Sequence, residues 1–194
     1  MRKKDLSKET KIQDAVAKII LTEGAQAVST TRVAKMVGIA QSNVYLYFKN
    51  KEELIDSVFK KEQEKVKQAA GIEKISDENL SLPQRVNAYL ESILHFGLHN
   101  PDCLILLREI KYLRKNSDKS PESVHDNTVV ELLTTASQAN LLKKLPASFL
   151  MSVVFNIVQI YSTGVKNGIY TSDEMTQATV LQVMRDAICF QVSE

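Results

Sequence analysis

Apolar residues along the chain recur mostly at helical spacing. The pattern is clearest near the N-terminus, where five apolar residues fall on one helix face, at i, i+3, i+4, i+7 and i+8: Ile12, Ala15, Val16, Ile19 and Ile20. Gly24 follows where a left-handed helix C-cap is expected. No stretch has the strict alternation of a half-buried strand, and no internal repeat is visible. The sequence therefore predicts an all-α protein of about nine helices.

The next stretch predicts two short helices separated by a tight turn. The segment "STTRVAKMVG" (29–38) begins with residues that cap helices, turns Val33, Ala34 and Val37 inward, and ends at a glycine. The segment "SNVYLYF" (42–48) predicts the second of the two.

A long, charged helix follows. Asn50 and Glu53 have the spacing of a helix cap, with Asn in place of the usual Ser or Thr. The helix is therefore expected to begin at Lys51 and to run to Gly71, with a polar linker over 72–80.

Prolines and a second capping pattern mark the remaining helices. Each of four prolines stands just before a periodic apolar run, and proline is favoured at the first helical position. The predicted helices cover about 83–99, 101–115, 121–141 and 146–166. Gly168 ends the last of these, and Thr171 with Glu174 forms a capping box for a final helix over about 172–191.

Charge and size suggest two domains. The 194 residues are 44% hydrophobic, which suffices for one or two real cores. Residues 1–53 hold ten Lys and Arg against six Asp and Glu, whereas residues 54–194 hold 15 against 17. The positive field therefore lies on the N-terminal part. We predict a helix-turn-helix domain over 1–52 and a second helical domain over 53–194.

Several classes of protein are disfavoured. Cys103 and Cys189 form neither a disulfide framework nor a zinc pattern, as expected for reduced thiols in a cytoplasmic protein. The basic N-terminus leads into an amphipathic stretch, so no signal peptide is expected. The most apolar segment, residues 147–161, is shorter than a membrane span and contains Asn156 and Gln159, so no membrane association is expected.

The spacing over 29–48 is that of a helix-turn-helix motif, although a bare pattern of this kind also fits a small bundle with no role at DNA. In this motif the second helix enters the major groove and its N-terminal residues meet the base edges. Gln41, Ser42 and Asn43 lie there. Glutamine and asparagine can bond adenine bidentately, and serine can serve several bases.

The aromatic residues after Asn43 are expected to have two roles, some facing DNA and others packing in the core. Tyr45 and Tyr47 are two apart and point to different sides, and Tyr47 is expected to face DNA. Phe48 and Val44, four apart, are expected to pack against the first helix. Lys51 adds its charge to the positive end of the next helix, where phosphate oxygens are favoured.

The segment "TRVAKMVGIAQSNVYLYFKNKEEL" (31–54) resembles the TetR family of bacterial transcriptional regulators. The resemblance is close over about residues 10–55. It implies double-stranded operator DNA as a partner and DNA contacts from eight positions: Thr31, Arg32, Gln41, Ser42, Asn43, Tyr45, Tyr47 and Lys51.

Two features at the N-terminal domain stay open. Ala40 stands where the family often has a Ser or Thr that caps the recognition helix. Losing such a cap lowers stability by about 1 kcal/mol. Gln41 or Ser42 would then take over the cap. The basic residues Arg2, Lys3 and Lys4 either form a solvated tail or touch phosphate.

Neither a metal nor an enzyme site is expected. His95, His99 and Cys103 are each four apart, but Pro101 breaks the helix between the second and the third. No nucleophile motif and no glycine-rich phosphate loop is present. We therefore predict no cofactor, no metal and no catalytic residue.

The helix predicted over 146–166 is apolar nearly all round and is expected to be buried on more than one side. A polar stripe runs along it: Ser148, Ser152, Asn156, Gln159 and Thr163. The stripe either faces a partner helix or lines a ligand cavity. The expected lining of such a cavity is largely apolar with a few polar groups: Tyr89, His95, Phe96, Leu106, Ile110, Leu113, Phe155, Asn156 and Gln159.

The resemblance further implies a homodimeric, ligand-responsive repressor. We expect the last two helices to pair across the two-fold axis, with Met184 and Ala187 at the interface. Helix 51–70 would link DNA binding to an unknown, small and mostly apolar ligand. The alternative is a regulator of the same fold that a protein partner controls.

Overall fold

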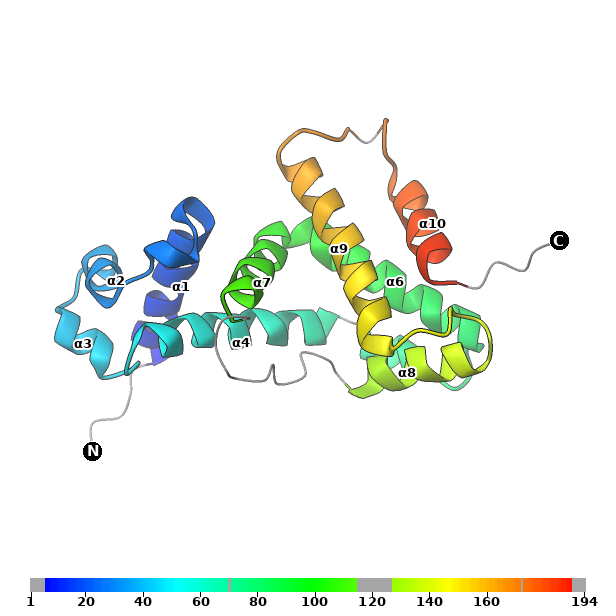
Figure 1. Ribbon diagram of the computed structural model, residues 1–194, viewed down its shortest axis with the longest axis horizontal. Coiled ribbons are helices and arrows are strands. Elements are labelled where there is room, and N and C mark those ends of the chain that lie inside the picture. The colour runs from blue at the N-terminus through cyan, green and yellow to red at the C-terminus, as the bar shows by residue number, and fades with distance from the viewer. Residues whose placement is uncertain (1–5, 70, 115–126, 172, 190–194) are drawn as a thin grey trace. The chain divides into compact units, whose positions relative to one another are not determined.

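The computed structural model describes residues 6–69, 71–114, 127–171 and 173–189 (Figure 1). These residues form ten α-helices and one short 3-10 helix, and within the described ranges the β-structure is limited to an isolated antiparallel bridge between Leu142 and Cys189. The all-α prediction is confirmed. The helices are α1 (Leu6–Glu23), η1 (Ala25–Ala27), α2 (Thr30–Val37), α3 (Gln41–Tyr45), α4 (Lys51–Ala69), α5 (Ile72–Ile75), α6 (Leu82–His99), α7 (Pro101–Arg114), α8 (Asn127–Gln138), α9 (Ala147–Lys166) and α10 (Gln177–Ile188).

The chain forms two compact units, and the division falls within α4. The first unit holds the described residues up to Glu64 together with Asp102–Arg114, and the second holds those from Lys65 to Pro101 and from Asn127 onward. α7 therefore belongs mainly with the N-terminal helices. The functional boundary that we expect between residues 52 and 53 stays a prediction.

In the first unit, α1 supplies a buried face, and η1 and α2 pack against this helix. All five residues of its predicted apolar face are buried. The left-handed cap predicted at Gly24 is wrong, because Gly24 has φ 84° and ψ 158°, which lies outside the left-handed helical region. The difference arises because η1 begins directly after Gly24, so the residue leads into a new turn. α7 is tied to α4 by Cys103 Sγ, which donates to the Glu62 carbonyl at 3.5 Å.

In the second unit, α9 packs against α6, α8 and α10, as Figure 1 shows. One face of α9 lies in the core, with Leu150, Val154 and Val158 fully buried. α10 is held to α6 by Arg185 Nη1, which donates to Asn87 Oδ1 at 2.8 Å. This unit is thus a small bundle in which α6 contacts α5, α8, α9 and α10.

Lys143 fixes the C-terminal end of α10. Its backbone N–H donates to the Ile188 carbonyl at 2.8 Å. Its Nζ donates to the carbonyls of Asp186 at 3.0 Å and Ala187 at 2.8 Å. These carbonyls belong to the last helical turn, where a cation is also favoured by the helix dipole.

Two boundaries differ from the predictions made around α4 and α6. The long helix ends at Ala69, and the stretch predicted as a linker contains α5. α5 forms because Ile75 is fully buried, and because Gly71 adopts a left-handed conformation with φ 63° at its start. Gly71 also lies close to α6, since a Cβ atom there would meet Ser92 Oγ at 2.5 Å.

The helices predicted from prolines stand where expected for α6, α7 and α9. For α8, which we predicted over 121–141, residues 121–126 lie outside the described part and the helix ends at Gln138. Asn140 follows at φ 57°, which ends the helix.

The start of the last helix was predicted too early. The capping box does form, since Thr171 Oγ1 accepts from the Glu174 N–H at 3.3 Å. The helix nevertheless begins at Gln177, because Thr176 takes the N-cap and accepts from the Thr179 N–H at 3.1 Å. Residues 172, 190 and 191 of the predicted range lie outside the described part.

The apolar segment 147–161, which we expected to be shorter than a membrane span, belongs to a longer helix. α9 runs for 20 residues, and by length and composition alone it could cross a membrane. A core helix of a soluble protein passes the same test. Because one face of α9 is buried against neighbouring helices, we interpret it as a core helix.

Candidate nucleic-acid interface

α2 is bounded by the two signals that its sequence predicts. Ser29 Oγ accepts from the Arg32 N–H at 3.3 Å and caps the N-terminus. Gly38 ends the helix in the left-handed region at φ 75° and ψ 35°. The Ile39 N–H then donates to the Ala34 carbonyl at 3.0 Å, which closes the turn. Val33 and Ala34 are buried as predicted, and Val37 is half-buried.

α3 is shorter than predicted. It spans Gln41–Tyr45, five residues, in place of 42–48. Its N-cap is Ala40, which makes no side-chain hydrogen bond. Gln41 does not replace the missing cap, because its amide Nε2 donates to Thr30 Oγ1 at 2.9 Å. The expected start of the recognition helix is therefore correct to within one residue, and its end is not.

The Thr30 hydroxyl joins the two helices of the motif. It accepts from Gln41 and also lies 3.2 Å from the hydroxyl of Tyr45. All three side chains are exposed, or nearly so. The sequence analysis did not include Thr30 among the site residues. A signal for it was present, because Ser29 serves as the N-cap and the hydroxyl of Thr30 is then available for another hydrogen bond.

The residues that follow Asn43 are partly buried and partly exposed. Val44 is fully buried and Phe48 nearly so, which confirms them as core. Tyr47, expected to face DNA, is half-buried, whereas Tyr45 exposes 50% of its surface. The reason is that α3 ends at Tyr45, so Tyr47 lies in a turn and no longer follows helical spacing.

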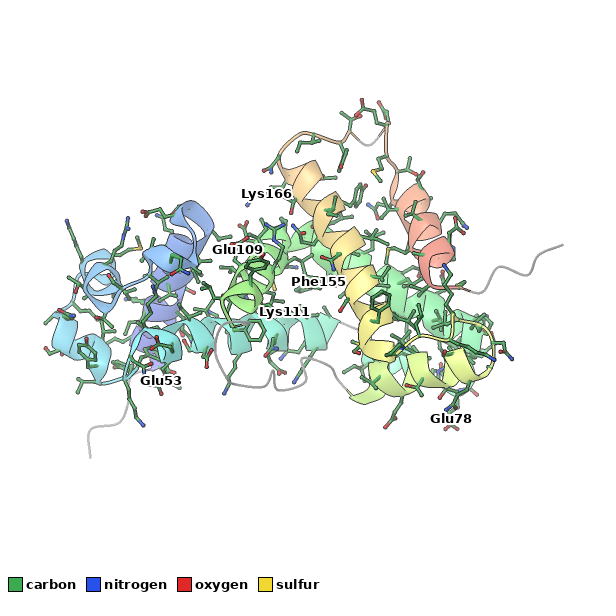
Figure 2. All side chains as sticks on the ribbon, viewed as in Figure 1. Glu53, Glu78, Glu109, Lys111, Phe155 and Lys166 are labelled. Atoms are coloured by element: carbon green, nitrogen blue, oxygen red, sulfur yellow. The ribbon has the colours of Figure 1, made fainter. Side chains whose placement is uncertain are left out.

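The start of α4 is capped almost as predicted. Asn50 Oδ1 accepts from the Glu53 N–H at 2.8 Å. The Glu53 carboxylate, at the start of α4 in Figure 2, accepts from the Lys49 N–H and not from that of Asn50. Lys51 Nζ donates to the Gln26 carbonyl at 2.8 Å, which holds η1 against the first turn of α4. An ammonium group has three donors, so two remain for a phosphate.

The remaining predicted contacts lie on the same motif. Thr31, Ser42 and Asn43 are exposed. Arg32 is exposed too, but its Nη2 pairs with Glu23 Oε2. Exposed ion pairs of this kind contribute little stability, so the guanidinium is free to exchange its partner for a phosphate at low cost. The basic residues 2–4 lie outside the described part of the chain.

The residues predicted to line a ligand cavity fall in both units. Tyr89, His95 and Phe96 lie on α6, and Phe155, labelled in Figure 2, lies on α9 with Asn156 and Gln159. Leu106, Ile110 and Leu113 lie on α7, in the first unit.

The structure brings together only part of this set. A groove of about 370 Å³ in the second unit contains His95 and Phe96. We call it the α6 groove, and its lining mixes charged, polar and apolar residues: Ala69, Lys74, Ala88, Glu91, Ser92, His95, Phe96, His99 and Asn100.

The polar stripe of α9 finds most of its partners within the helix. Ser152 Oγ donates to the Ser148 carbonyl at 2.8 Å, and Asn156 Nδ2 donates to the Ser152 carbonyl at 2.7 Å. Gln159 Nε2 donates to Thr163 Oγ1 at 3.0 Å. No buried side-chain nitrogen or oxygen among the described residues lacks a hydrogen bond. These groups therefore do not require a ligand to satisfy them.

A buried phenol and a half-buried thiol in the second unit stay protonated. Burial raises the pKa of the Tyr89 phenol well above its usual range, so the group stays protonated. Burial also raises the pKa of the Cys189 thiol, although nearby Arg185 and Lys143 oppose the effect. A protonated thiol is a poor nucleophile.

Comparison with known proteins agrees with this geometry. The sequence pattern described as "Bacterial regulatory proteins, tetR family" matches residues 12–58. The crystal structure of a proposed transcription regulator from Lactobacillus plantarum is 43% identical and has a TM-score of 0.81, covering 94% of this chain and 98% of that chain. A TetR family transcription regulator from Marinobacter aquaeolei VT8 is 20% identical with a TM-score of 0.77, covering 98% and 100% of the two chains, which shows the shared fold.

Curated relatives match over shorter segments. The fatty acid metabolism regulator protein of Bacillus subtilis (strain 168) is 40% identical over 53 residues, 27% of each chain. The nucleoid occlusion factor SlmA of Vibrio atlanticus (strain LGP32) is 28% identical over 96 residues, 49% of this chain and 48% of that one. The matched segments of the curated relatives span 27% to 60% of their length.

A capped helix, a glycine turn and a second helix with exposed polar residues define a helix-turn-helix DNA-binding protein. The chain belongs to the TetR family of transcriptional regulators.

Proposed function

We propose that the protein is a homodimeric, cytoplasmic repressor that a small, mostly apolar ligand releases from its operator. In this proposal the N-terminal domain, residues 1–52, binds DNA, and residues 53–194 form the dimer and take up the ligand. The observation that carries it is the Gln41–Thr30–Tyr45 cluster. It presents hydrogen-bonding side chains on the two helices of the motif, above a core made by Val44 and Phe48.

Contacts at DNA would be of two kinds. Gln41 and Asn43, near the start of α3, have the amide groups that recognise adenine. Lys51 and Arg32 have cationic groups that suit phosphate oxygens and set the register of the protein on the duplex. In this proposal Tyr45 contributes a phosphate contact through its hydroxyl.

The dimer is supported by an apolar stripe on α9 that its own unit does not cover. Phe149 and Ile160 expose 55% and 57% of their surface, and Val153 lies between them at helical spacing. On α10, Val183 exposes 43%. Two helices with uncovered apolar faces are suited to a four-helix interface with a second copy. Met184, which we expected at this interface, is fully buried inside its own unit and is therefore not available there.

The ligand would act on the second unit. Tyr89 and Phe96 of α6 and Gln159 of α9 are buried, and α6 and α9 pack against each other. A ligand that fits between the helices in one arrangement of the dimer would favour that arrangement, and its effect is limited by its difference in affinity between the two states. The new spacing of the recognition helices would no longer match the operator half-sites.

Control by a protein partner is the second candidate. It is favoured by the hydrogen bond between Gln159 and Thr163, which leaves the polar stripe without a need for a ligand. The names of the curated relatives include both a regulator of fatty acid metabolism and a nucleoid occlusion factor, so these matches do not decide between a small ligand and a protein partner.

A DNA-binding experiment tests the proposal. DNA from upstream of the protein's own gene and random DNA of equal length are titrated in a mobility-shift assay at two salt concentrations. We expect tighter binding to the upstream fragment, as a dimer. Equal affinity for both DNA molecules would contradict an operator there. A thermal-shift screen with small apolar molecules then separates the ligand from the partner, since a ligand raises the melting temperature.

A further inference from the structure

His95 and His99 lie one helical turn apart on α6, and their rings face each other. The ring centroids are 4.2 Å apart and the ring planes meet at 31°. Both side chains are exposed, and both line the α6 groove. The DNA-binding proposal gives this pair no role.

One ring of the pair already makes the hydrogen bond that metal-bound histidines commonly make. The Nδ1 atom of His99 lies 2.8 Å from the His95 carbonyl oxygen. A carbonyl can only accept, so Nδ1 carries the proton and Nε2 of the same ring keeps its lone pair. Metal-bound histidines commonly donate their second ring N–H to a backbone carbonyl, which fixes the tautomer and the ring orientation.

The spacing of the rings also fits. A metal–nitrogen bond is about 2.0–2.1 Å long, so two nitrogens bound to one ion lie roughly 3–3.5 Å apart. Rings with centroids 4.2 Å apart and planes at 31° have to turn so that one nitrogen of each ring points at the same ion, and exposed side chains can turn without disturbing the core.

The surroundings define the class of ion. Imidazole nitrogen suits nickel, copper and zinc, whereas magnesium and calcium prefer oxygen ligands. Glu91 and Lys74 also line the groove. Because their charges are opposite, they add little net charge, and the imidazole nitrogens decide which ion binds. Among the described residues no three side chains of His, Cys, Asp or Glu gather as a metal site, so water would complete the coordination. Cys103 takes no part, because it is buried and bonded to the Glu62 carbonyl.

We propose that His95 and His99 together bind one divalent late transition metal ion on the surface of α6, with their side-chain nitrogens as the two protein ligands. The proposal is independent of operator binding. It predicts a site that forms without any change in fold and that exchanges its metal readily with solvent.

The test uses the full chain without a polyhistidine tag. Ni²⁺ is titrated calorimetrically into the wild type and into the His95→Gln and His99→Gln variants. We expect one ion per chain for the wild type and an affinity at least about tenfold lower for each variant, since each loses one of two ligands. The His125→Gln variant, which removes the third histidine of the chain and leaves the pair, is the matched control and should bind as the wild type does.

A spectroscopic measurement checks the ligands directly. Electron paramagnetic resonance of the Cu²⁺-loaded protein should show coupling to two imidazole nitrogens in the wild type and to one in each single variant. Circular dichroism checks that the variants are folded. The proposal is overturned if the wild type binds Ni²⁺ no more tightly than the His99→Gln variant, or if the His125→Gln variant loses the site.

Discussion

The Tyr170 ring lies directly against Gly164, with no room for a side chain between them. A Cβ atom at residue 164 would stand 2.3 Å from the Cδ2 and Cε2 atoms of the ring. The same ring stacks on Tyr161 with centroids 6.4 Å apart, and the Ile169 N–H donates to the Gly164 carbonyl at 2.8 Å. Gly164 therefore allows the chain after α9 to fold back onto the helix.

The first prediction follows from this contact. Gly164→Ala should force the Tyr170 ring away and lower the free energy of unfolding by about 1–3 kcal/mol. Denaturant unfolding measures the loss. In the double variant with Tyr170→Ala the added methyl group has space, so most of the loss from Gly164→Ala should disappear. An equal effect of Gly164→Ala with and without Tyr170 would contradict the contact.

The second prediction concerns the turn between α2 and α3. No atom lies within 4 Å of a Cβ built at Gly38, so the cost of a side chain there is backbone strain at φ 75°. Gly38→Ala should destabilise the protein by about 1–2 kcal/mol, and Gly38→Asn by less, because asparagine tolerates this region better. Thermal unfolding of the two variants gives the comparison. If asparagine proved as costly as alanine, something other than left-handed strain would limit the turn.

The third prediction concerns Lys143. Lys143→Met keeps the aliphatic stem and the backbone bond to Ile188 but removes the two side-chain bonds to the end of α10. We expect a loss of about 1–2 kcal/mol and faster amide exchange in the last turn of α10. Lys144→Met is the control, since this neighbouring side chain is exposed. Similar amide-exchange rates in Lys143→Met and Lys144→Met would show that the Lys143 side chain does not hold the end of α10.

The fourth prediction separates two roles at DNA. Lys51→Ala should weaken binding to operator and random DNA alike and reduce the slope of log affinity against log salt by about 1. Gln41→Ala should mainly reduce the preference for the operator, by about 1–3 kcal/mol. Because Lys51 also bonds to Gln26, its variant needs a check of thermal stability. Operator affinity at the wild-type level in both variants would place the recognition surface elsewhere.

The fifth prediction concerns assembly. Ile160→Glu places a charge on the α9 stripe and should convert the dimer to monomers, with loss of tight operator binding. The control is Ile72→Glu, which adds the same charge at the start of α5. Ile72 exposes 36% of its surface, and an acidic residue is favoured there. Light scattering gives the mass of each variant. A wild type that is monomeric at micromolar concentration, or an unchanged dimer in Ile160→Glu, would contradict the interface.

The sequence was sufficient for the helix-turn-helix motif because its signals are local. Ser29 and Gly38 act within one turn of α2, and the apolar face of α1 follows from a simple period. The end of α3 was misjudged because apolar and aromatic residues continue past Tyr45, yet the chain turns there to bring Phe48 into the core.

Other features depend on contacts between distant residues. Thr171 has a complete capping pattern, but Thr176 competes with it, and no local rule decides which one starts the helix. The α6 groove forms where Ala69 and Lys74 lie beside α6. The spacing of apolar residues along the chain does not predict such a contact. Met184 was placed at an interface because apolar helix faces look alike whether they meet their own chain or another.

The bond from Gln41 to Thr30 has a consequence for how the protein finds its site. The amide that would bond to a base is already held within the free protein, at 2.9 Å. While the protein slides along unrelated DNA, we expect that bond to stay closed, with phosphate contacts alone supporting the sliding. Arrival at the operator would then include the transfer of the Gln41 hydrogen bond from Thr30 to a base. For this side chain, search and recognition would differ by one rotation.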